Sequence, residues 1–450
     1  MLRRFLGAFL SLAALWGILA ARQKGSGDPV FAQIDSIVKS LSEITGLSEK
    51  HPVPYGRMTK RQLRKFLDKR IKKTLKPDEI YSDELALKMF GLVPQDFDLK
   101  RSTIDLLTEQ AAAFYDYDEK KLFLLDDSSF TSETTTLAHE LSHALADQHF
   151  DLDKFMEDTA SNDDENLAHT AVVEGQASWL MIAYGLKQAG QAPAPTPEML
   201  ESVADSSETS MADYPVLKAS PLYIQQSLLF PYTEGTLFFD AVYKKLGKQA
   251  FTAVFTDAPV DSAEIIHPSR YFNHQKGTKP ELPKLALNKE GKQLTEGSVG
   301  EFDHKMLLQQ YAGEPQAAAL APHLLGGEFK IVEAGKERRP VLEYVSQWDS
   351  EAEAADFFAD YKKILRKKWQ HCNVSTANET TVSGAGDNGY FVTRLTGNSV
   401  TSIEGLSDMN DWQRLKTPPS VQSAARVAFT AKAGGGLRAS PSPSNRALGR

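Results

Sequence analysis

The run HELSH at residues 139–143 restricts the fold of this chain more than any other segment. Apolar residues at 137, 141, 144 and 145 follow a helical spacing, so the run is predicted to lie in a helix. Residues four apart share one face of a helix. The sequence therefore predicts a helix that directs the imidazoles of His139 and His143 toward the same point.

Two neutral imidazoles can bind one Zn²⁺, and the intervening Glu140 leans toward the place of a metal-bound water. These three groups are what zinc-assisted hydrolysis requires. We expect His139 and His143 to be metal ligands and Glu140 to be a general base. An amphipathic helix with two solvated histidines is the alternative, which the apolar flanking positions disfavour.

A third protein ligand is needed, and two residues compete for that place. His149 lies six residues after His143, as in the HExxHxxGxxH pattern, but Ala146 stands where that pattern has glycine. Glycine permits the sharp exit from the helix, whereas alanine favours its continuation. Glu174 instead lies in an apolar helical run, where an unpaired carboxylate is costly, and Gly175 permits close helix contact. We favour Glu174 as the ligand, with an ion pair to Lys or Arg as the alternative.

These residues carry a family resemblance. HELSHAL followed by VVEGQAS resembles the gluzincin-type HExxH zinc metallopeptidases of the zincin-like class. With FYDYDEKKLFL upstream and LLFPYTEGTLFF and IIHPSRYF downstream, residues 90–275 are similar to a group of exported bacterial metallopeptidases. The resemblance implies His139, His143 and Glu174 as zinc ligands, Glu140 as the base, and a peptide or protein substrate.

The sequence departs from that family pattern at one position. An acidic residue often follows the glutamate ligand by four residues, but this chain has Ser178 there. In the family pattern that acid is the partner of one histidine ligand, so the partner is left open here, with Asp147 as a candidate.

Zinc peptidases usually add a hydrogen-bond donor for the oxyanion that develops opposite the base. Three residues are candidates for this role: Tyr232 in the apolar helix predicted over 228–247, and His267 and Tyr271 in the run IIHPSRY. His267 precedes a proline in a non-helical turn, where it can equally serve to close the domain. Both interpretations of His267 stay open at this point.

The N-terminus has the pattern of a targeting segment. Arg3 and Arg4 precede an uncharged run rich in Leu, Ala and Phe that extends to Ala21. The run is at the short limit of a membrane span, so residues 1–21 are either a signal peptide or a membrane anchor. Either interpretation places the rest of the chain outside the cytoplasm, secreted, periplasmic or membrane-anchored, and allows membrane association through this segment.

Composition narrows the class of partner. A net charge of −8 argues against nucleic acid as the main partner. Cys372 is the only cysteine, which excludes an intrachain disulfide and a cysteine-based zinc site. The leading hypothesis is an exported zinc peptidase. The alternative is a catalytically silent metal-binding scaffold or partner-binding protein, against which the retained Glu140 argues.

The predicted fold class is α+β, with a mainly helical zincin-like domain, a small β-hairpin or sheet, and a smaller C-terminal α/β domain. After residues 1–21, the expected parts are a helical region (22–100), the zincin-like domain (101–275), the C-terminal domain (276–415) and a low-complexity, disordered tail (416–450). In the C-terminal domain we expect strands at 327–332 and 341–348, a helix at 350–368, and a hairpin turned at Gly397-Asn398.

Two further segments bear on function. Residues 57–76 are strongly basic, with an apolar stripe at helical spacing, and are predicted to form a helix that packs by this stripe or contacts an anionic membrane surface. Residues 111–125 are predicted to form a hairpin. By resemblance, residues 121–125 are a free strand edge on which an extended peptide docks, with an ordinary hairpin as the alternative.

Overall fold

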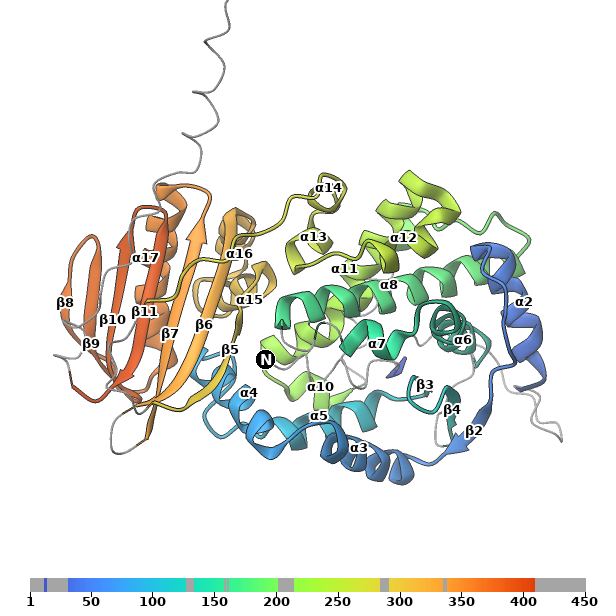
Figure 1. Ribbon diagram of the computed structural model, residues 1–450, viewed down its shortest axis with the longest axis horizontal. Helices are drawn as coiled ribbons and strands as arrows, with labels where there is room; N and C mark the ends of the chain where they lie inside the picture. The colour runs from blue at the N-terminus through green and yellow to red at the C-terminus, as the bar shows by residue number, and fades with distance from the viewer. Residues whose placement is uncertain are drawn as a thin grey trace, which may run out of the picture.

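The computed structural model describes residues 12–13, 31–126, 133–157, 159, 162–200, 214–283, 291–334 and 338–408. Figure 1 shows an extensive helical part beside a large β-sheet, which agrees with the predicted α+β class. The predicted tail (416–450) and nearly all of the predicted signal or anchor segment (1–21) lie outside the described residues. Within the described chain, no helix is both long enough and apolar enough to cross a membrane.

The helices of the helical part lie between residues 31 and 272. Its first members are η1 (Phe31–Gln33), α2 (Ile34–Thr45), α3 (Lys60–Thr74), α4 (Pro77–Phe90), α5 (Leu99–Gln110), α6 (Glu133–Phe150), α7 (Leu152–Glu157) and α8 (Asp163–Gln188). Its later members are α10 (Pro215–Ala219), α11 (Leu222–Leu246), η3 (Gly247–Gln249), α12 (Ala250–Thr256), α13 (Ser262–Ile266) and α14 (Pro268–Phe272). Helix α8 packs against both α6 and α11, so it lies at the centre of this part.

The basic segment forms α3, which starts after the Thr59 cap. Its apolar stripe is buried, as the packing interpretation predicts: Leu63, Leu67 and Ile71 are at most 1% exposed. Many of its cations are paired with nearby acids, namely Arg64 with Asp105, Arg70 with Asp116, Lys72 with Asp68, and Lys73 with Asp118. Four of the eight cations of α3 therefore have an acidic partner nearby.

A small sheet lies beside α6, with strand order β1-β3-β4-β2. Its strands are β1 (Leu12–Ala13), β2 (Tyr55–Met58), β3 (Ala113–Asp116) and β4 (Lys121–Leu125). The hairpin β3–β4 confirms the predicted one, but β4 pairs with β3 on one side and in parallel with β2 on the other. The predicted free edge at 121–125 is therefore wrong, because a segment far upstream in the sequence covers it.

The C-terminal sheet has seven strands in the order β5-β6-β7-β11-β10-β9-β8, and every neighbouring pair is antiparallel. The strands are β5 (Gln293–Ser298), β6 (Leu324–Ala334), β7 (Arg339–Trp348), β8 (Asn373–Ala377), β9 (Thr381–Gly386), β10 (Gly389–Thr396) and β11 (Ser399–Leu406). The predicted strands, helix and hairpin correspond to β6, β7, α17 (Glu351–Lys368) and β10–β11. The α/β label is corrected to α+β, since hairpins rather than parallel crossovers connect most of the strands.

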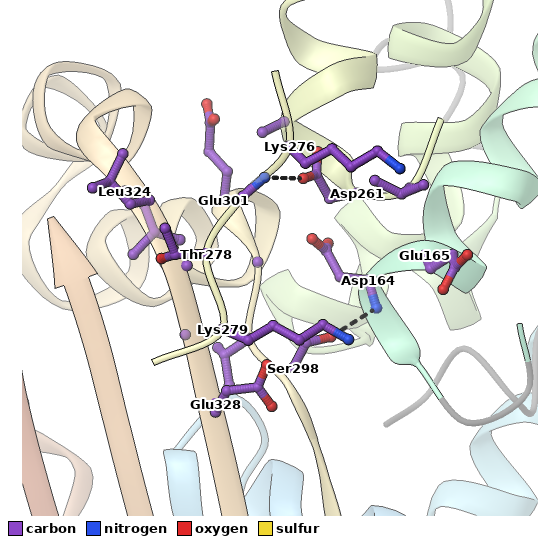
Figure 2. Close-up of a pocket in the computed structure, with 18 of the residues that line it drawn as sticks. Asp164, Glu165, Asp261, Lys276, Thr278, Lys279, Ser298, Glu301, Leu324 and Glu328 are labelled. Atoms are coloured by element: carbon purple, nitrogen blue, oxygen red, sulfur yellow. Dashed lines mark hydrogen bonds between the residues drawn. The ribbon is translucent and has the colours of Figure 1, made fainter. Parts of the chain in front are cut away.

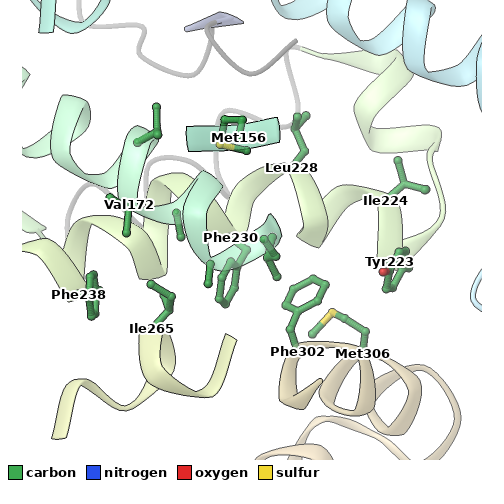
Figure 3. Close-up of a cluster of buried hydrophobic side chains, with 14 of the residues drawn as sticks. Met156, Val172, Tyr223, Ile224, Leu228, Phe230, Phe238, Ile265, Phe302 and Met306 are labelled. Atoms are coloured by element: carbon green, nitrogen blue, oxygen red, sulfur yellow. The ribbon is translucent and has the colours of Figure 1, made fainter. Parts of the chain in front are cut away.

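Two helices join this sheet to the helical part: α15 (Glu301–Ala312) and α16 (Glu314–Leu320), followed by η4 (Ala321–His323). Figure 3 shows a cluster in which Phe302 and Met306 of α15 face Phe230 of α11, with Val172 of α8 and Ile265 of α13 close by. All of these side chains are buried. One apolar core thus continues across the predicted boundary at residue 275. Helices α8, α11 and α15 pack together through this core.

Candidate metal centre

Helix α6 runs without a break through the HELSH segment, and it buries the whole of it. His139 and His143 are each 1% exposed, and Glu140 is 0% exposed. The two imidazole rings meet edge to face, with ring centroids 4.7 Å apart. The predicted geometry, two imidazoles on one helix face, is confirmed.

A glycine contact brings α8 and α11 together beside Glu174. A Cβ placed on Gly175 would lie only 2.1 Å from the backbone of Gly235, and one on Gly235 would lie 2.3 Å from the Ala171 carbonyl oxygen. Only glycine at both positions permits this backbone contact. The contact positions Glu174 from α8 and Tyr232 from α11, so the close approach predicted for Gly175 is confirmed.

Glu174 converges with the two histidines, as predicted. Its Oε2 lies 3.1 Å from His139 Nε2 and 3.4 Å from His143 Nε2, and the two Nε2 atoms are 3.0 Å apart. Ligands of one tetrahedral zinc ion stand roughly 3.3 Å apart, because bonds of about 2.0–2.2 Å meet at tetrahedral angles. The three atoms therefore have the spacing of a metal-ligand triad, and this buried group can hold a metal ion.

Hydrogen bonds alone cannot account for this triangle. Each Nε2 carries at most one hydrogen, and a carboxylate only accepts. If both nitrogens are protonated they repel each other, and if one is not, its lone pair faces the other acceptor, Glu174. A cation at the centre satisfies all three contacts at once.

Two further atoms of the triad are buried without a hydrogen-bond partner among the described residues, Glu174 Oε1 and His139 Nδ1. Glu174 Oε1 is available to a metal ion, whereas Nδ1 lies on the far side of the ring and lacks the outer partner that a ligand histidine usually has. Burial raises the pKa of Glu174, but the two adjacent imidazoles outweigh it, so the pKa is lowered overall. Glu174 thus stays an anion although it is fully buried, and an anion is what a metal ion requires.

Glu140 is held in place by the small sheet. Its Oε2 accepts a hydrogen bond of 2.7 Å from the backbone N–H of Tyr115 in β3. Its charge also acts on the tyrosines beside the triad, Tyr117 and Tyr232, whose pKa values it helps to raise. Glu140 therefore follows the ligand candidate His139 on α6 and is not a member of the metal triad.

Tyr232 lies at the site, as predicted. Its ring stacks on His139 with centroids 6.1 Å apart. Burial raises the pKa of Tyr232 well above its ordinary value, and the carboxylates of Glu174 and Glu140 and a hydrogen bond to Glu174 raise it further. The Tyr232 hydroxyl is thus directed to the Glu174 carboxylate, so the predicted use of this hydroxyl as an oxyanion donor is not supported.

Tyr117 was not among the residues that the sequence indicated. It follows β3, and its ring meets that of His143 edge-on with centroids 6.2 Å apart. Burial raises the pKa of its hydroxyl well above the ordinary value, and Glu174 and Glu140 add to this. No sequence signal singled it out, because its contact with His143 depends on how the hairpin packs on α6.

Two residues proposed near the site have other roles. His149 lies in the last turn of α6, where its Nε2 is 2.8 Å from the carbonyl oxygen of Ser48, so the metzincin-like alternative does not fit. Asp147 accepts hydrogen bonds from the Tyr115 hydroxyl and from Lys120, rather than from a histidine ligand. The suggested role of Asp147 as a histidine partner is wrong, because its carboxylate is hydrogen-bonded to residues of the β3–β4 hairpin.

His267 and Tyr271 are also placed elsewhere. His267 Nε2 lies 2.8 Å from a carboxylate oxygen of Glu301 at the start of α15, so it closes the junction between the two parts of the molecule. Tyr271 packs edge-on against Phe238, and burial, with Asp257 and Glu264, raises its pKa to about 12. The prediction that His267 serves the metal centre is therefore not supported; its alternative role in closing the domain fits.

A cavity of about 320 Å³ lies at this junction, between the N-terminus of α8, α13 and strands β5 and β6 (Figure 2). Its walls carry charges of both signs: Asp164, Asp261, Glu301 and Glu328 on one hand, and Arg270, Lys276 and Lys279 on the other. None of the metal-triad residues lines it. This cavity is therefore separate from the metal triad, and its mixed charge favours no single class of ligand.

Comparisons with protein-family models, with curated proteins and with solved structures found no match for this chain. Its function must therefore be argued from the residues themselves.

Proposed function

We propose that this protein is a zinc-dependent peptidase of the gluzincin type, with His139, His143 and Glu174 as ligands. The observation that carries the proposal is the buried triangle of two Nε2 atoms and one carboxylate oxygen, 3.0–3.4 Å apart, with Glu140 beside it on the same helix. Three protein ligands leave one position for water or substrate, whereas structural zinc sites use four.

Two imidazoles and one carboxylate also suit Fe²⁺, so the donor set alone does not choose the metal. Glu140 is what favours zinc hydrolysis, because a carboxylate beside the open position has a direct use there as a base. When bound, Zn²⁺ supplies Lewis-acid polarisation of a carbonyl group and a lowered pKa for coordinated water.

Glu140 would take a proton from the attacking water and deliver it to the leaving amine nitrogen as the peptide bond breaks. The Tyr115 backbone N–H fixes one oxygen of this carboxylate. Tyr232 orients Glu174 through the α8–α11 contact described above. The low exposure of all four side chains excludes bulk water, which strengthens every charge interaction among them.

A peptide substrate needs a surface on which to dock. Leu12–Ala13 pairs antiparallel with Phe114 and Ala113 on the outer edge of β3, the strand that holds Glu140. Removal of residues 1–21, as expected for a signal peptide, would take β1 off this edge and leave it available to an extended peptide. Export of the chain from the cytoplasm is part of the same proposal.

One observation favours the alternative of a metal-binding scaffold without activity. His139, His143, Glu140 and Glu174 are all at most 1% exposed, so substrate can reach them only if the surroundings open. A scaffold needs no such opening. The two functions differ in what Glu140 does, since a scaffold has no use for a base.

The test is cleavage of a mixed peptide library by the zinc-loaded protein without residues 1–21, compared with its Glu140→Gln variant. We expect cleavage by the first and a rate lower by about 10²–10⁴-fold in the second, with zinc retained in both. His149→Ala is the matched control and should keep both zinc and activity. Full zinc binding with no cleavage by either protein, with and without residues 1–21, would establish the scaffold instead.

A further inference from the structure

Three tyrosines surround the metal triad, and their hydroxyl groups are used differently. Tyr115 donates to Asp147 at 2.9 Å, and Tyr232 is hydrogen-bonded to Glu174. The Tyr117 hydroxyl is buried, and it has no hydrogen-bond partner among the described residues. Within the part of the chain that the structure describes, Tyr117 thus brings a spare donor to the site.

A buried hydroxyl without a partner lowers stability, because it has given up its bonds to water and gained nothing in return. Phenylalanine would fill the same space without that cost. A hydroxyl at such a position therefore needs an explanation other than packing. Hydrogen bonding to a bound molecule is one, and the surroundings of Tyr117 indicate which molecule.

The ring of Tyr117 contacts His143, a metal ligand, and its hydroxyl is near enough to both Glu174 and Glu140 to feel their charges. Tyr117 therefore contacts one metal ligand, His143, and lies within range of the charges of Glu174 and of the base. In the proposed reaction, the atom that gains negative charge between these groups is the carbonyl oxygen of the scissile bond. Of the three residues expected from the sequence to stabilise it, His267 is paired with Glu301, Tyr271 packs on Phe238, and the Tyr232 hydroxyl is hydrogen-bonded to Glu174.

We propose that Tyr117 is a catalytic residue whose hydroxyl donates a hydrogen bond to the scissile carbonyl oxygen as that oxygen becomes negative. The inference rests on the proposed peptidase function. As the water oxygen bonds to the carbonyl carbon, the π electrons move to the carbonyl oxygen, where Tyr117 stabilises them. When the electrons return, the C–N bond breaks and the amine leaves with the proton held by Glu140. Tyr117 keeps its own proton throughout.

The test compares the zinc-loaded protein with its Tyr117→Phe variant on a peptide that the wild type cleaves. Loss of one oxyanion donor should lower kcat by about 10²–10³-fold, while KM and zinc content stay within about twofold. The variant should melt at the same temperature as the wild type or higher, because it loses an unsatisfied hydroxyl. Tyr184→Phe is the matched control: Tyr184 is buried on α8, ten residues beyond Glu174, and its loss should leave kcat unchanged.

A kcat of Tyr117→Phe within about threefold of the wild type would overturn the inference and leave the proposed function standing. A variant that loses zinc or melts lower would also overturn it, because Tyr117 would then serve the structure of the site. If the wild type cleaves no peptide at all, both the proposed function and this inference are wrong. The wild-type rate therefore tests the proposed function, and the ratio of kcat between wild type and Tyr117→Phe tests the role of Tyr117.

Discussion

Two of the buried polar clusters in the described chain, one in the helical part and one in the C-terminal sheet, differ in completeness. In the sheet part, the Glu404 carboxylate accepts hydrogen bonds from Tyr361 at 2.7 Å, Ser402 at 3.0 Å and Lys368 at 2.5 Å. Every partner is a residue of this chain. A cluster of this kind is complete as folded and has no need of a ligand.

The helical cluster is incomplete by the same measure. His139 Nδ1, Glu174 Oε1, Ser178 Oγ and the Tyr117 hydroxyl are buried without hydrogen-bond partners in the described chain, while three ligand atoms crowd round one point. Buried polar atoms are normally satisfied, so the shortfall indicates missing partners such as a metal ion, water or substrate. The comparison suggests that function lies where the fold leaves polar atoms unsatisfied.

The largest expected loss of stability follows from a substitution in the complete cluster around Glu404. Lys368→Met should reduce the free energy of unfolding by about 3–5 kcal/mol, because it leaves the Glu404 charge buried without its partner. Lys72→Met removes an exposed ion pair with Asp68 and should have little effect. Urea denaturation of the three proteins measures the difference. A small loss at Lys368 would mean that the sheet cluster is less complete than its contacts indicate.

A second prediction breaks the helix contact that assembles the incomplete cluster. Gly175→Ala forces a Cβ to within 2.1 Å of the Gly235 backbone and should cost about 1–3 kcal/mol and weaken zinc binding. Gly185→Ala on the same helix meets no atom within 4 Å and should stabilise the protein by about 0.5–1 kcal/mol. Denaturation and zinc titration of both variants check this pair. Unchanged zinc affinity in Gly175→Ala would show that the contact does not position Glu174.

Acid should weaken the sheet part through His304. Its Nδ1–H donates to the Gly300 carbonyl and its Nε2 accepts from the Tyr344 hydroxyl, so the ring is neutral. Burial lowers its pKa from 6.5 to about 4. A lowered histidine pKa contributes stability that is present above pH 6.5 and is lost as the pH falls toward 4.

Lowering the pH from 7 to 5 should therefore cost about 2 kcal/mol from this residue. Urea denaturation of the wild type and His304→Gln at both pH values isolates the contribution, because the variant lacks it. Equal pH dependence in the two proteins would rule His304 out as the cause.

The smallest predicted effect compares two hydroxyls directly. Tyr361→Phe removes the bond to Glu404 and should cost about 1 kcal/mol, more if the carboxylate stays unsatisfied. Tyr117→Phe should cost nothing or stabilise the protein. In thermal melts, the melting temperature of Tyr361→Phe should fall, whereas that of Tyr117→Phe should stay the same or rise. Equal losses would mean that the two clusters do not differ as described.

The features that the sequence predicted depend on local periodicity. His139 and His143 follow from the four-residue spacing in a helix, and Glu174 from being an isolated acid in an apolar run. The hairpin β3–β4 follows from its alternation and turn. Each of these patterns is complete within fewer than twenty residues, so no tertiary information was needed.

The errors concern contacts between distant segments. The edge of β4 is covered by β2, more than sixty residues upstream, and His267 faces Glu301 of a helix that the sequence did not indicate. Strands β5 and β8 were not predicted, because they are short, polar and lie at the sheet edges, and β9 was not predicted, because Ser and Gly interrupt its apolar pattern. Tyr117 reaches His143 only because β3 packs on α6, and no spacing rule relates residues of a strand to residues of a helix.

The central claim is that the triad of His139, His143 and Glu174 binds zinc. The direct test is metal analysis of the purified protein by mass spectrometry, with Glu174→Gln and His149→Ala prepared in parallel. The account predicts about one zinc per chain in the wild type and His149→Ala, and almost none in Glu174→Gln. A wild type without metal after zinc reconstitution, or a Glu174→Gln variant that keeps its zinc, would contradict it.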